Sequence, residues 1–384
     1  MTATATPAQP AAVGAEVALP EIDAHPHARA VLGPVVAGTV APSHAYLFHG
    51  PAGTGKRAVA RAFAATLLMD GARTPGTVAE RVARDSHPDL TWVIPSGAAE
   101  MLVADIEEPV VAAATRTPFE SARRVFVIES ADAMNDQAAN RMLKTLEEPP
   151  SFAHLLLLTD RREDVLATIS SRCQLVRFDP LPWARIAQGL EGVGEDRARA
   201  CARLALGDAG RAERLASEEG VALRARAEEF VRAALAGSTS ARPWLGLLEL
   251  AKAAGTAAGE RAQERLVSEL ELVPSKERKK YEREGLDARR RGERRARTRT
   301  LDLALGLAEL WLRDVLCVRE GAGELVYAVD RRAELESDAE GREPARLREA
   351  MELVGATRLS LTLNVSEELA LEALAYRVEA LLAI

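Results

Sequence analysis

Short apolar runs alternate with longer segments of helical periodicity between residues 22 and 180. Runs of four or five apolar residues, rich in Leu, β-branched and aromatic side chains, are typical of strands buried on both faces of a parallel sheet. The helical segments between them are the crossovers that parallel strands require. The pattern therefore predicts an α/β region with strands at residues 45–48, 90–94, 125–128, 155–158 and 175–178.

The end signals of two helices in this region can be read directly. One helix runs from about residue 56 to 68 and follows a glycine-rich turn. The other begins after Asn135 or Asp136, either of which can cap its first turn. It ends at Pro149 and Pro150, because proline cannot donate to the helix ladder.

Beyond Pro180 the strand pattern stops and helical periodicity remains. A break at residues 207–210 and a Gly/Ser/Thr linker at residues 237–240 divide it. A highly charged stretch at residues 276–299 interrupts its last part. The chain is thus predicted to consist of a disordered tail (1–21), an α/β domain (22–180), a small helical domain (181–240) and an all-α domain (241–384).

The composition narrows the functional class. With 384 residues, 47% of them apolar, the chain can build two or three ordinary cores. A net charge of −7 excludes a polycation that coats nucleic acid, so any such contact needs a local basic patch. The sequence has no apolar run long enough for a membrane span and no signal-peptide pattern at its start. We expect a cytoplasmic protein with no membrane contact.

A glycine-rich loop at residues 50–56 lies between a predicted strand and a predicted helix. Such a loop exposes successive backbone N–H groups, and the helix dipole adds positive potential, so the loop can hold phosphates. Lys56 is positioned to contact the terminal phosphates, but the following Ser or Thr that usually holds magnesium is replaced by Arg57. The context predicts a nucleotide-binding fold. Whether the loop binds a nucleotide or is a packing turn stays open.

The acidic site after the third strand also departs from the usual pattern. Nucleotide-hydrolysing folds commonly place an Asp there for magnesium, and a further residue positions the attacking water. This chain has Glu129 followed by Ser130, whose hydroxyl is not a base near neutral pH. We expect little intrinsic ATPase activity. The alternative is a competent ATPase in which Lys56 and Glu129 suffice with magnesium.

Two strings further along the chain are highly specific. Residues 143–150 read Leu-Lys-Thr-Leu-Glu-Glu-Pro-Pro, and residues 171–173 read Ser-Arg-Cys, after a leucine-rich strand that ends at Thr159. These strings resemble those of the AAA+ clamp-loader subunits of bacterial DNA polymerase III. The delta-prime branch of this family, rather than its gamma/tau motor, is favoured by the further resemblance of residues 44–48, 311–316, 364–365 and 369–372.

The resemblance implies an AAA+ parallel-sheet nucleotide-binding domain (22–180), a helical lid (181–240) and an all-α collar for oligomerisation (241–384). It also implies a ring of five subunits that loads the sliding clamp onto primer–template DNA. The implied partners are the gamma/tau and delta subunits, with clamp and DNA reached through the complex. The implied cofactor is ATP or ADP with magnesium. Zinc is not expected, because the four cysteines that many members carry are missing from residues 70–86.

The resemblance also assigns roles to single residues. Arg172 would be an arginine finger that reaches the ATP site of a neighbouring subunit, worth about 10³–10⁵ in rate in related reactions. The alternative is that it pairs with a carboxylate of its own chain. Thr159 would sense the γ-phosphate, or else make a strand-end hydrogen bond. Motor subunits carry a second sensor, an arginine in the helical lid; here Gly210 matches that position and Arg211 follows it. The candidate nucleotide-binding residues are Gly50, Pro51, Ala52, Gly53, Thr54, Gly55, Lys56, Arg57, Glu129, Thr159 and Arg211.

The charged stretch at residues 276–299 allows two interpretations. Its clustered Lys and Arg residues could hold DNA phosphates with salt-dependent, sequence-independent affinity. Its interleaved acids instead suit a solvated or inter-subunit helix with ion pairs along its surface. Only Tyr281 could stack on a base. The second interpretation is favoured, and a DNA-binding module anchored here remains a separate hypothesis.

Overall fold

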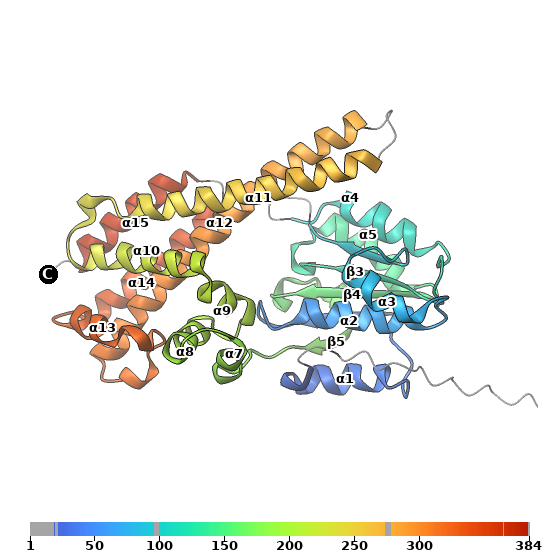
Figure 1. Cartoon of the computed structure of the whole chain (residues 1–384), viewed down its shortest axis with the longest axis horizontal. Coiled ribbons are helices and arrows are strands. Elements are labelled where there is room, and N and C mark those ends of the chain that lie inside the picture. Colours follow the sequence, from blue (N-terminus) through green and yellow to red (C-terminus); the bar gives the residue numbers. More distant parts are fainter. Residues whose placement is uncertain (1–18, 20–21, 96–99, 273–277, 364, 383–384) are drawn as a thin grey trace, which may run out of the picture. The chain divides into compact units, whose positions relative to one another are not determined.

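The computed structural model describes residues 19, 22–95, 100–272, 278–363 and 365–382. The chain forms two compact units, Met1–Leu181 and Pro182–Ile384 (Figure 1). The predicted disordered tail lies outside the described residues, apart from Leu19. Within the second unit, the predicted division into lid and collar at residue 240 stays a prediction.

A parallel sheet of five strands forms the centre of the first unit (Figure 1). The strands pair in the order β2-β3-β4-β1-β5, and every pairing is parallel. The predicted strands are confirmed to within one or two residues at their ends. They are β1 (Ala45–His49), β2 (Leu90–Val93), β3 (Arg124–Ile128), β4 (Ala153–Thr159) and β5 (Gln174–Arg177).

Helices cover both faces of this sheet. Successive side chains of a strand point to opposite faces, and here the side chains on both faces are apolar and need cover. Leu47 and Leu155 pack in one core with residues of α4, η2 and α5, whereas Phe48 and Leu156 pack in the other with residues of α1, α2 and α3. The helices are α1 (Pro26–Val36), α2 (Lys56–Met69), α3 (Pro75–Ala83), α4 (Val103–Ile106), the π-helical η2 (Glu107–Ala112), α5 (Asp136–Glu147) and α6 (Ala167–Ser170), with 3-10 turns at Ile22–Ala24, Ala131–Ala133 and Arg162–Asp164.

The register of the strands brings the site residues together. β1 and β4 end side by side, with His49 opposite Thr159. β3 ends at Ile128, on the other side of β4. The carboxyl ends of parallel strands share one edge of the sheet, where α/β proteins bind their ligands. The glycine-rich loop and the residues that follow β3 and β4 therefore converge.

A buried histidine lies in the central strand of the sheet. His154 of β4 is 2% exposed, and its Nδ1 lies 2.9 Å from the backbone oxygen of Ser43. Burial, the largest cause, lowers the pKa of His154 from 6.5 to about 4, although the hydrogen bond to Ser43 acts in the opposite direction. The folded protein therefore favours the neutral ring.

This histidine is expected to make the first unit sensitive to acid. Because its folded pKa lies below its unfolded pKa, its contribution to stability is present above pH 6.5 and is lost as the pH falls toward 4. The loss should reach about 3 kcal/mol of unfolding free energy. Urea unfolding of the wild type and of His154→Gln at a series of pH values checks this. An equal pH dependence in the two proteins would contradict it.

The second unit is built from helices. The predicted break is confirmed but lies two residues earlier, at residues 205–208, with Leu206 and Gly207 both at positive φ. Among the described residues, no helix is long and apolar enough to cross a membrane. The helices are α7 (Trp183–Gly189), α8 (Glu195–Leu204), α9 (Ala209–Ala216), α10 (Glu218–Leu235), α11 (Trp244–Leu272), α12 (Arg278–Arg319), α13 (Arg332–Ala339), α14 (Pro344–Thr362) and α15 (Glu367–Leu382), with 3-10 turns at Thr239–Ala241, Gly323–Leu325 and Val329–Arg331.

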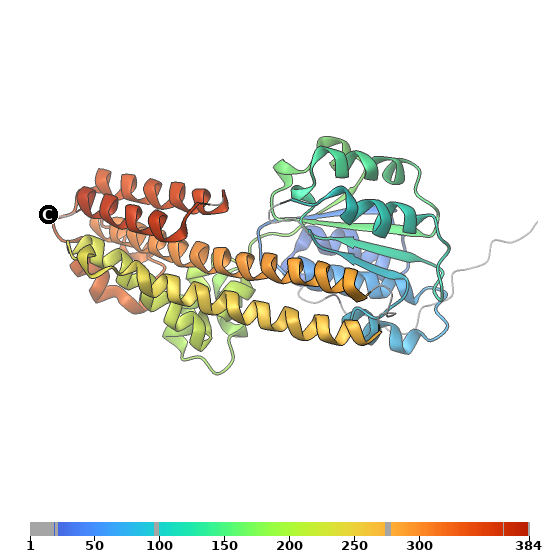
Figure 2. The same cartoon turned by 90° about the horizontal axis from the view of Figure 1, so that it is seen from above.

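The charged stretch does not interrupt the helical pattern, contrary to the prediction. From Arg278 onward it is the first half of α12, a helix of 42 residues that lies beside α11 (Figure 2). Arg, Lys and Glu are good helix formers, so charge alone gives no break. Glycines of α11 make room for the charged side chains, since a Cβ at Gly259 would lie 2.1 Å from a carboxylate oxygen of Glu293. Lys276 and Glu277 lie outside the described residues.

A cluster of charges is buried in the second unit. The Arg224 side chain of α10 is only 8% exposed and donates two hydrogen bonds to Asp330, of 2.9 and 2.8 Å. It also pairs with Glu228 at 2.7 Å. These contacts join α10 to the short turn that precedes α13.

Candidate functional site

The glycine-rich loop follows β1 and leads into α2, as predicted. Gly50, Gly53 and Gly55 have φ values of +144°, +69° and +82°, which only glycine adopts readily. A Cβ at Gly50 would lie 2.0 Å from the backbone oxygen of Phe178, so the loop also needs glycine for packing. The backbone of the loop thus requires glycine at these positions, and its phosphate-binding role stays a prediction.

Lys56 lies in the interior of this loop. Its side chain is 6% exposed, and its ammonium group donates to the backbone oxygens of Gly50 and Pro51, at 2.6 Å each. It forms an ion pair of 2.8 Å with Asp160, which directly follows β4. Thr54 is buried and donates to Pro51 at 3.0 Å. Lys56 therefore holds the loop in shape and places a positive charge inside it.

The two residues that depart from the usual pattern pair with each other. Arg57 donates through one terminal nitrogen to Glu129 Oε1 at 2.6 Å. The indole N–H of Trp92, from β2, donates to the same oxygen at 2.5 Å. The Glu129 side chain is 14% exposed, whereas that of Arg57 is 71% exposed. A largely exposed guanidinium and a nearly buried carboxylate thus lie beside the start of α2.

This arrangement does not fit the magnesium ion that the resemblance implies. Magnesium prefers oxygen ligands in a tight octahedron. The loop presents the guanidinium of Arg57 where the hydroxyl ligand is usual, and one oxygen of Glu129 already accepts two donors. Within the described part of the chain, no group of three or more His, Cys, Asp or Glu residues is placed to hold a metal ion.

Thr159 makes hydrogen bonds within its own chain. Its hydroxyl donates to Asp132 at 2.8 Å and accepts from the backbone N–H of Arg161 at 3.0 Å. The Arg161 guanidinium pairs with the same Asp132 at 3.0 Å. Thr159 thus makes the strand-end hydrogen bonds that the sequence allowed as the alternative to phosphate sensing. Its role as a phosphate sensor stays a prediction.

Arg172 follows α6 and pairs with a carboxylate of its own chain in this structure. It donates to Glu147 at 2.6 Å and to the backbone oxygen of Thr168 at 2.9 Å. Its side chain is 35% exposed and that of Glu147 is 49% exposed. An ion pair this exposed contributes little stability, so a foreign phosphate can compete for the guanidinium. Burial raises the pKa of neighbouring Cys173 to about 12, so this thiol is a poor nucleophile.

Arg211 is the one candidate nucleotide-binding residue of the second unit. It lies on α9, where burial is the largest cause that lowers its pKa, and Arg358 adds to the effect. The side chain of Asp208 caps this helix by accepting from the Arg211 backbone N–H at 2.7 Å. The other candidate residues belong to the first unit, and a nucleotide-binding role for Arg211 stays a prediction.

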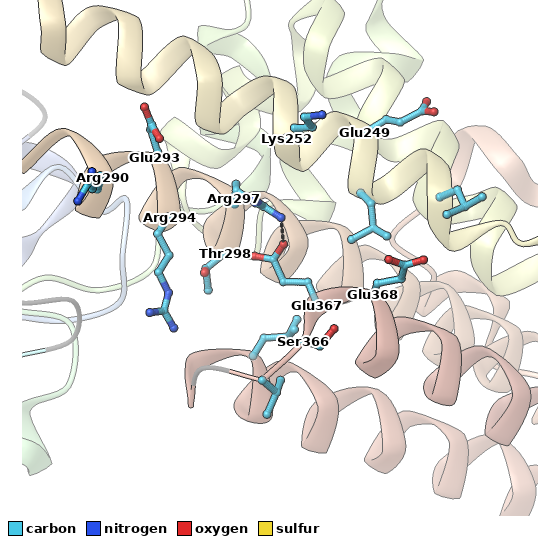
Figure 3. Close-up of a pocket in the computed structure, with 14 residues that line it drawn as sticks. Glu249, Lys252, Arg290, Glu293, Arg294, Arg297, Thr298, Ser366, Glu367 and Glu368 are labelled. Atoms are coloured by element: carbon cyan, nitrogen blue, oxygen red, sulfur yellow. Dashed lines mark hydrogen bonds and ion pairs between the residues drawn. The ribbon is translucent and has the colours of Figure 1, made fainter. Parts of the chain in front are cut away.

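The basic stretch of α12 lines a groove of about 740 Å³ together with α11 and the start of α15 (Figure 3). Arg297 pairs with Glu367 across it, and Arg289 pairs with Glu293 along the helix. Bases and acids both line the groove, so it has no clear preference for anions. Among the described residues, Arg290 and Arg294 have no acidic partner. Both interpretations of this stretch stay open.

Sequence reasoning missed the partners of the candidate residues. Asp160 pairs with Lys56, Trp92 with Glu129 and Asp132 with Thr159, and none of these was singled out. The sequence did contain a signal for Asp160. This residue directly follows β4, and the carboxyl ends of parallel strands are where ligand-binding residues gather. The other two come from separate strands and turns, and only the fold brings them close.

The first unit is similar to known proteins. Residues 37–182 match a family described as DNA polymerase III, delta subunit. The DNA polymerase III subunit delta-prime of Pseudomonas aeruginosa is 39% identical over 147 residues, which are 37% of this chain and 44% of that protein. The delta-prime subunit of Bacillus subtilis is 36% identical over 145 residues, which are 36% and 43% of the two chains.

The subunit tau of Bacillus subtilis is also similar, with 34% identity over 143 residues, which are 36% of this chain and 24% of that protein. The two delta-prime subunits named above are therefore more similar to this chain than this tau subunit is. These findings confirm, over the first unit, the predicted resemblance to subunits of DNA polymerase III and to the delta-prime branch. The chain spans less than half the length of these relatives.

Proposed function

We propose that this chain, whose first unit matches delta-prime subunits of DNA polymerase III, is the delta-prime-type subunit of a clamp loader. In this role it takes part in the ATP-dependent loading of the sliding clamp onto primer–template DNA during replication. It acts mainly as a stationary subunit that donates Arg172 to the ATP site of a neighbour. It would thus be a component of a nucleotidyltransferase complex in the cytoplasm, associated with the nucleoid.

The ion pair between Arg57 and Glu129 is the observation that carries the stationary role. A motor subunit needs a hydroxyl and a carboxylate for its metal ion and a group that positions water. Here the first two positions bind each other, and Ser130 stands where the water-positioning group is expected. Arg172, by contrast, is accessible at the surface. The chain is better equipped to complete a foreign site than to hydrolyse ATP in its own.

The proposed partners follow from this role. The gamma/tau and delta subunits would form the ring with this chain, and the clamp and primer–template DNA would be reached through the complex. The nucleotide, if the loop of this chain holds one, would be ATP or ADP. The Lys56 ammonium and the N–H groups at the start of α2 would contact its phosphates.

ATP turnover by the purified chain tests this proposal. We expect turnover that does not rise above the level of Lys56→Ala, because the groups that bind metal and position water are missing. Phosphate release by both proteins, with magnesium in excess, measures it. Turnover that Lys56→Ala abolishes would instead favour the competent gamma/tau-type ATPase, which the similarity to tau keeps as the alternative.

A further inference from the structure

The loop retains the groups that bind phosphate but not those that bind metal. We propose that residues 50–56 bind the phosphates of a nucleoside di- or triphosphate without a divalent cation, because the Arg57–Glu129 ion pair takes the place of the ion and its two protein ligands. This inference goes beyond the proposed function, which depends on Arg172 and needs no nucleotide in this chain.

The phosphate-binding groups are present in a formed geometry. The glycines of the loop have positive φ, and α2, with 14 residues, begins directly after them. The first N–H groups of such a helix are free to donate to an anion. Lys56 is fixed inside the loop by two backbone oxygens. Its carboxylate partner Asp160 is 55% exposed, so that partner can move aside for a phosphate.

The metal-binding groups are replaced rather than simply lost. Glu129 is held by two donors on one oxygen, and little of its side chain meets solvent. A dication brought to this carboxylate would also meet the guanidinium of Arg57, and like charges at short distance repel strongly. A magnesium ion would therefore have to break both contacts and displace the arginine. Arg57 excludes the ion by charge as well as by position.

Arg57 can supply part of the positive charge that the metal would bring. It uses one terminal nitrogen for Glu129, and 71% of its side chain is exposed. Most of this side chain is therefore open to solvent. Guanidinium groups bind phosphate oxygens through two parallel hydrogen bonds, which an ammonium group cannot do. A bound nucleotide would then meet two fixed cations, Lys56 and Arg57, in the absence of magnesium.

Nucleotide titrations of the full chain test the proposal. Fluorescent N-methylanthraniloyl ADP and ATP are titrated in excess magnesium and in EDTA, and the two Kd values of the wild type should agree within about threefold. The double variant Arg57→Thr with Glu129→Asp restores the usual metal ligands. Its Kd should be at least about tenfold weaker in EDTA than in magnesium. Arg84→Thr, which removes an exposed arginine of the same unit, should behave like the wild type.

Two results would overturn the proposal. One is a wild-type Kd that weakens about tenfold or more when magnesium is removed. The other is the lack of nucleotide binding by the wild type in both buffers, which would leave the loop as a packing turn. Circular dichroism of each variant shows whether it is folded. Neither result touches the role of Arg172, which is measured in the assembled loader.

Discussion

Replacing Arg172 with alanine is expected to lower ATP turnover at the neighbouring site by about 10³-fold or more, while the ring still assembles. The guanidinium would lie opposite the charge that develops on the transferred phosphoryl group, and alanine leaves that charge uncompensated. Assembly should persist because the lost contacts with Glu147 and Thr168 are exposed and local. Phosphate release by a loader reconstituted with clamp and primed DNA measures the effect.

The partner of this arginine provides the matched control. Glu147→Gln removes the carboxylate that holds Arg172 in the free chain but keeps the guanidinium. Turnover should stay the same or rise, because Arg172 is then released more readily to a phosphate. If Arg172→Ala leaves the turnover of a fully assembled ring unchanged, the arginine-finger role is wrong, and the pair with Glu147 is the function of this side chain.

Replacing Arg224 with alanine is expected to lower the unfolding free energy of the second unit by about 3–5 kcal/mol. The change would remove the closest cation of Asp330 and Glu228, whose side chains are 15% and 16% exposed, and leave them the longer ion pairs with Arg331, at 3.5 and 3.2 Å. Two carboxylates with so little solvent, left to share one partly exposed arginine, are costly. Urea unfolding of the full chain followed by circular dichroism measures the loss at the helical transition.

An exposed arginine nearby is the control for this prediction. Arg332 pairs with Glu336 along α13, and the two side chains are 62% and 56% exposed. Arg332→Ala should cost no more than about 1 kcal/mol, because water screens and solvates both groups. Equal losses for Arg224→Ala and Arg332→Ala would mean that the buried cluster adds no more stability than a surface pair.

The sequence predicts what depends on local patterns and short spacings. Apolar runs predicted the strands, and the sequence narrowed the cap of α5 to Asn135 or Asp136. The structure shows that Asn135 is the cap, because its side chain accepts from the backbone N–H of Ala138 at 2.9 Å. The turn at Gly50 was readable because its neighbours are a strand and a helix. These features are set by residues close together in the chain, so no knowledge of the fold is needed.

The pairing of side chains across the fold could not be predicted in the same way. Arg57 and Glu129 were each recognised as departures from a pattern, but their contact depends on β3 ending beside the loop. Likewise, Glu147 was read as part of a family string, and the structure gives it Arg172 as a partner. The prediction that the charged stretch interrupts the last helical region was wrong. The run of charges was taken as the end of a helix, although Arg, Lys and Glu favour helix.

The length of α12 has a mechanical consequence. At 1.5 Å per residue its 42 residues form one rod of about 63 Å. Leu301, Leu305 and Leu312 are fully buried on one of its faces, and helical spacing puts Arg290 and Arg294 on that face nearer the tip. Helices bend gently unless proline or a similar defect kinks them. No proline lies between the arginines and the leucines, so a force applied at the arginines would be transmitted along the helix to the packed leucines.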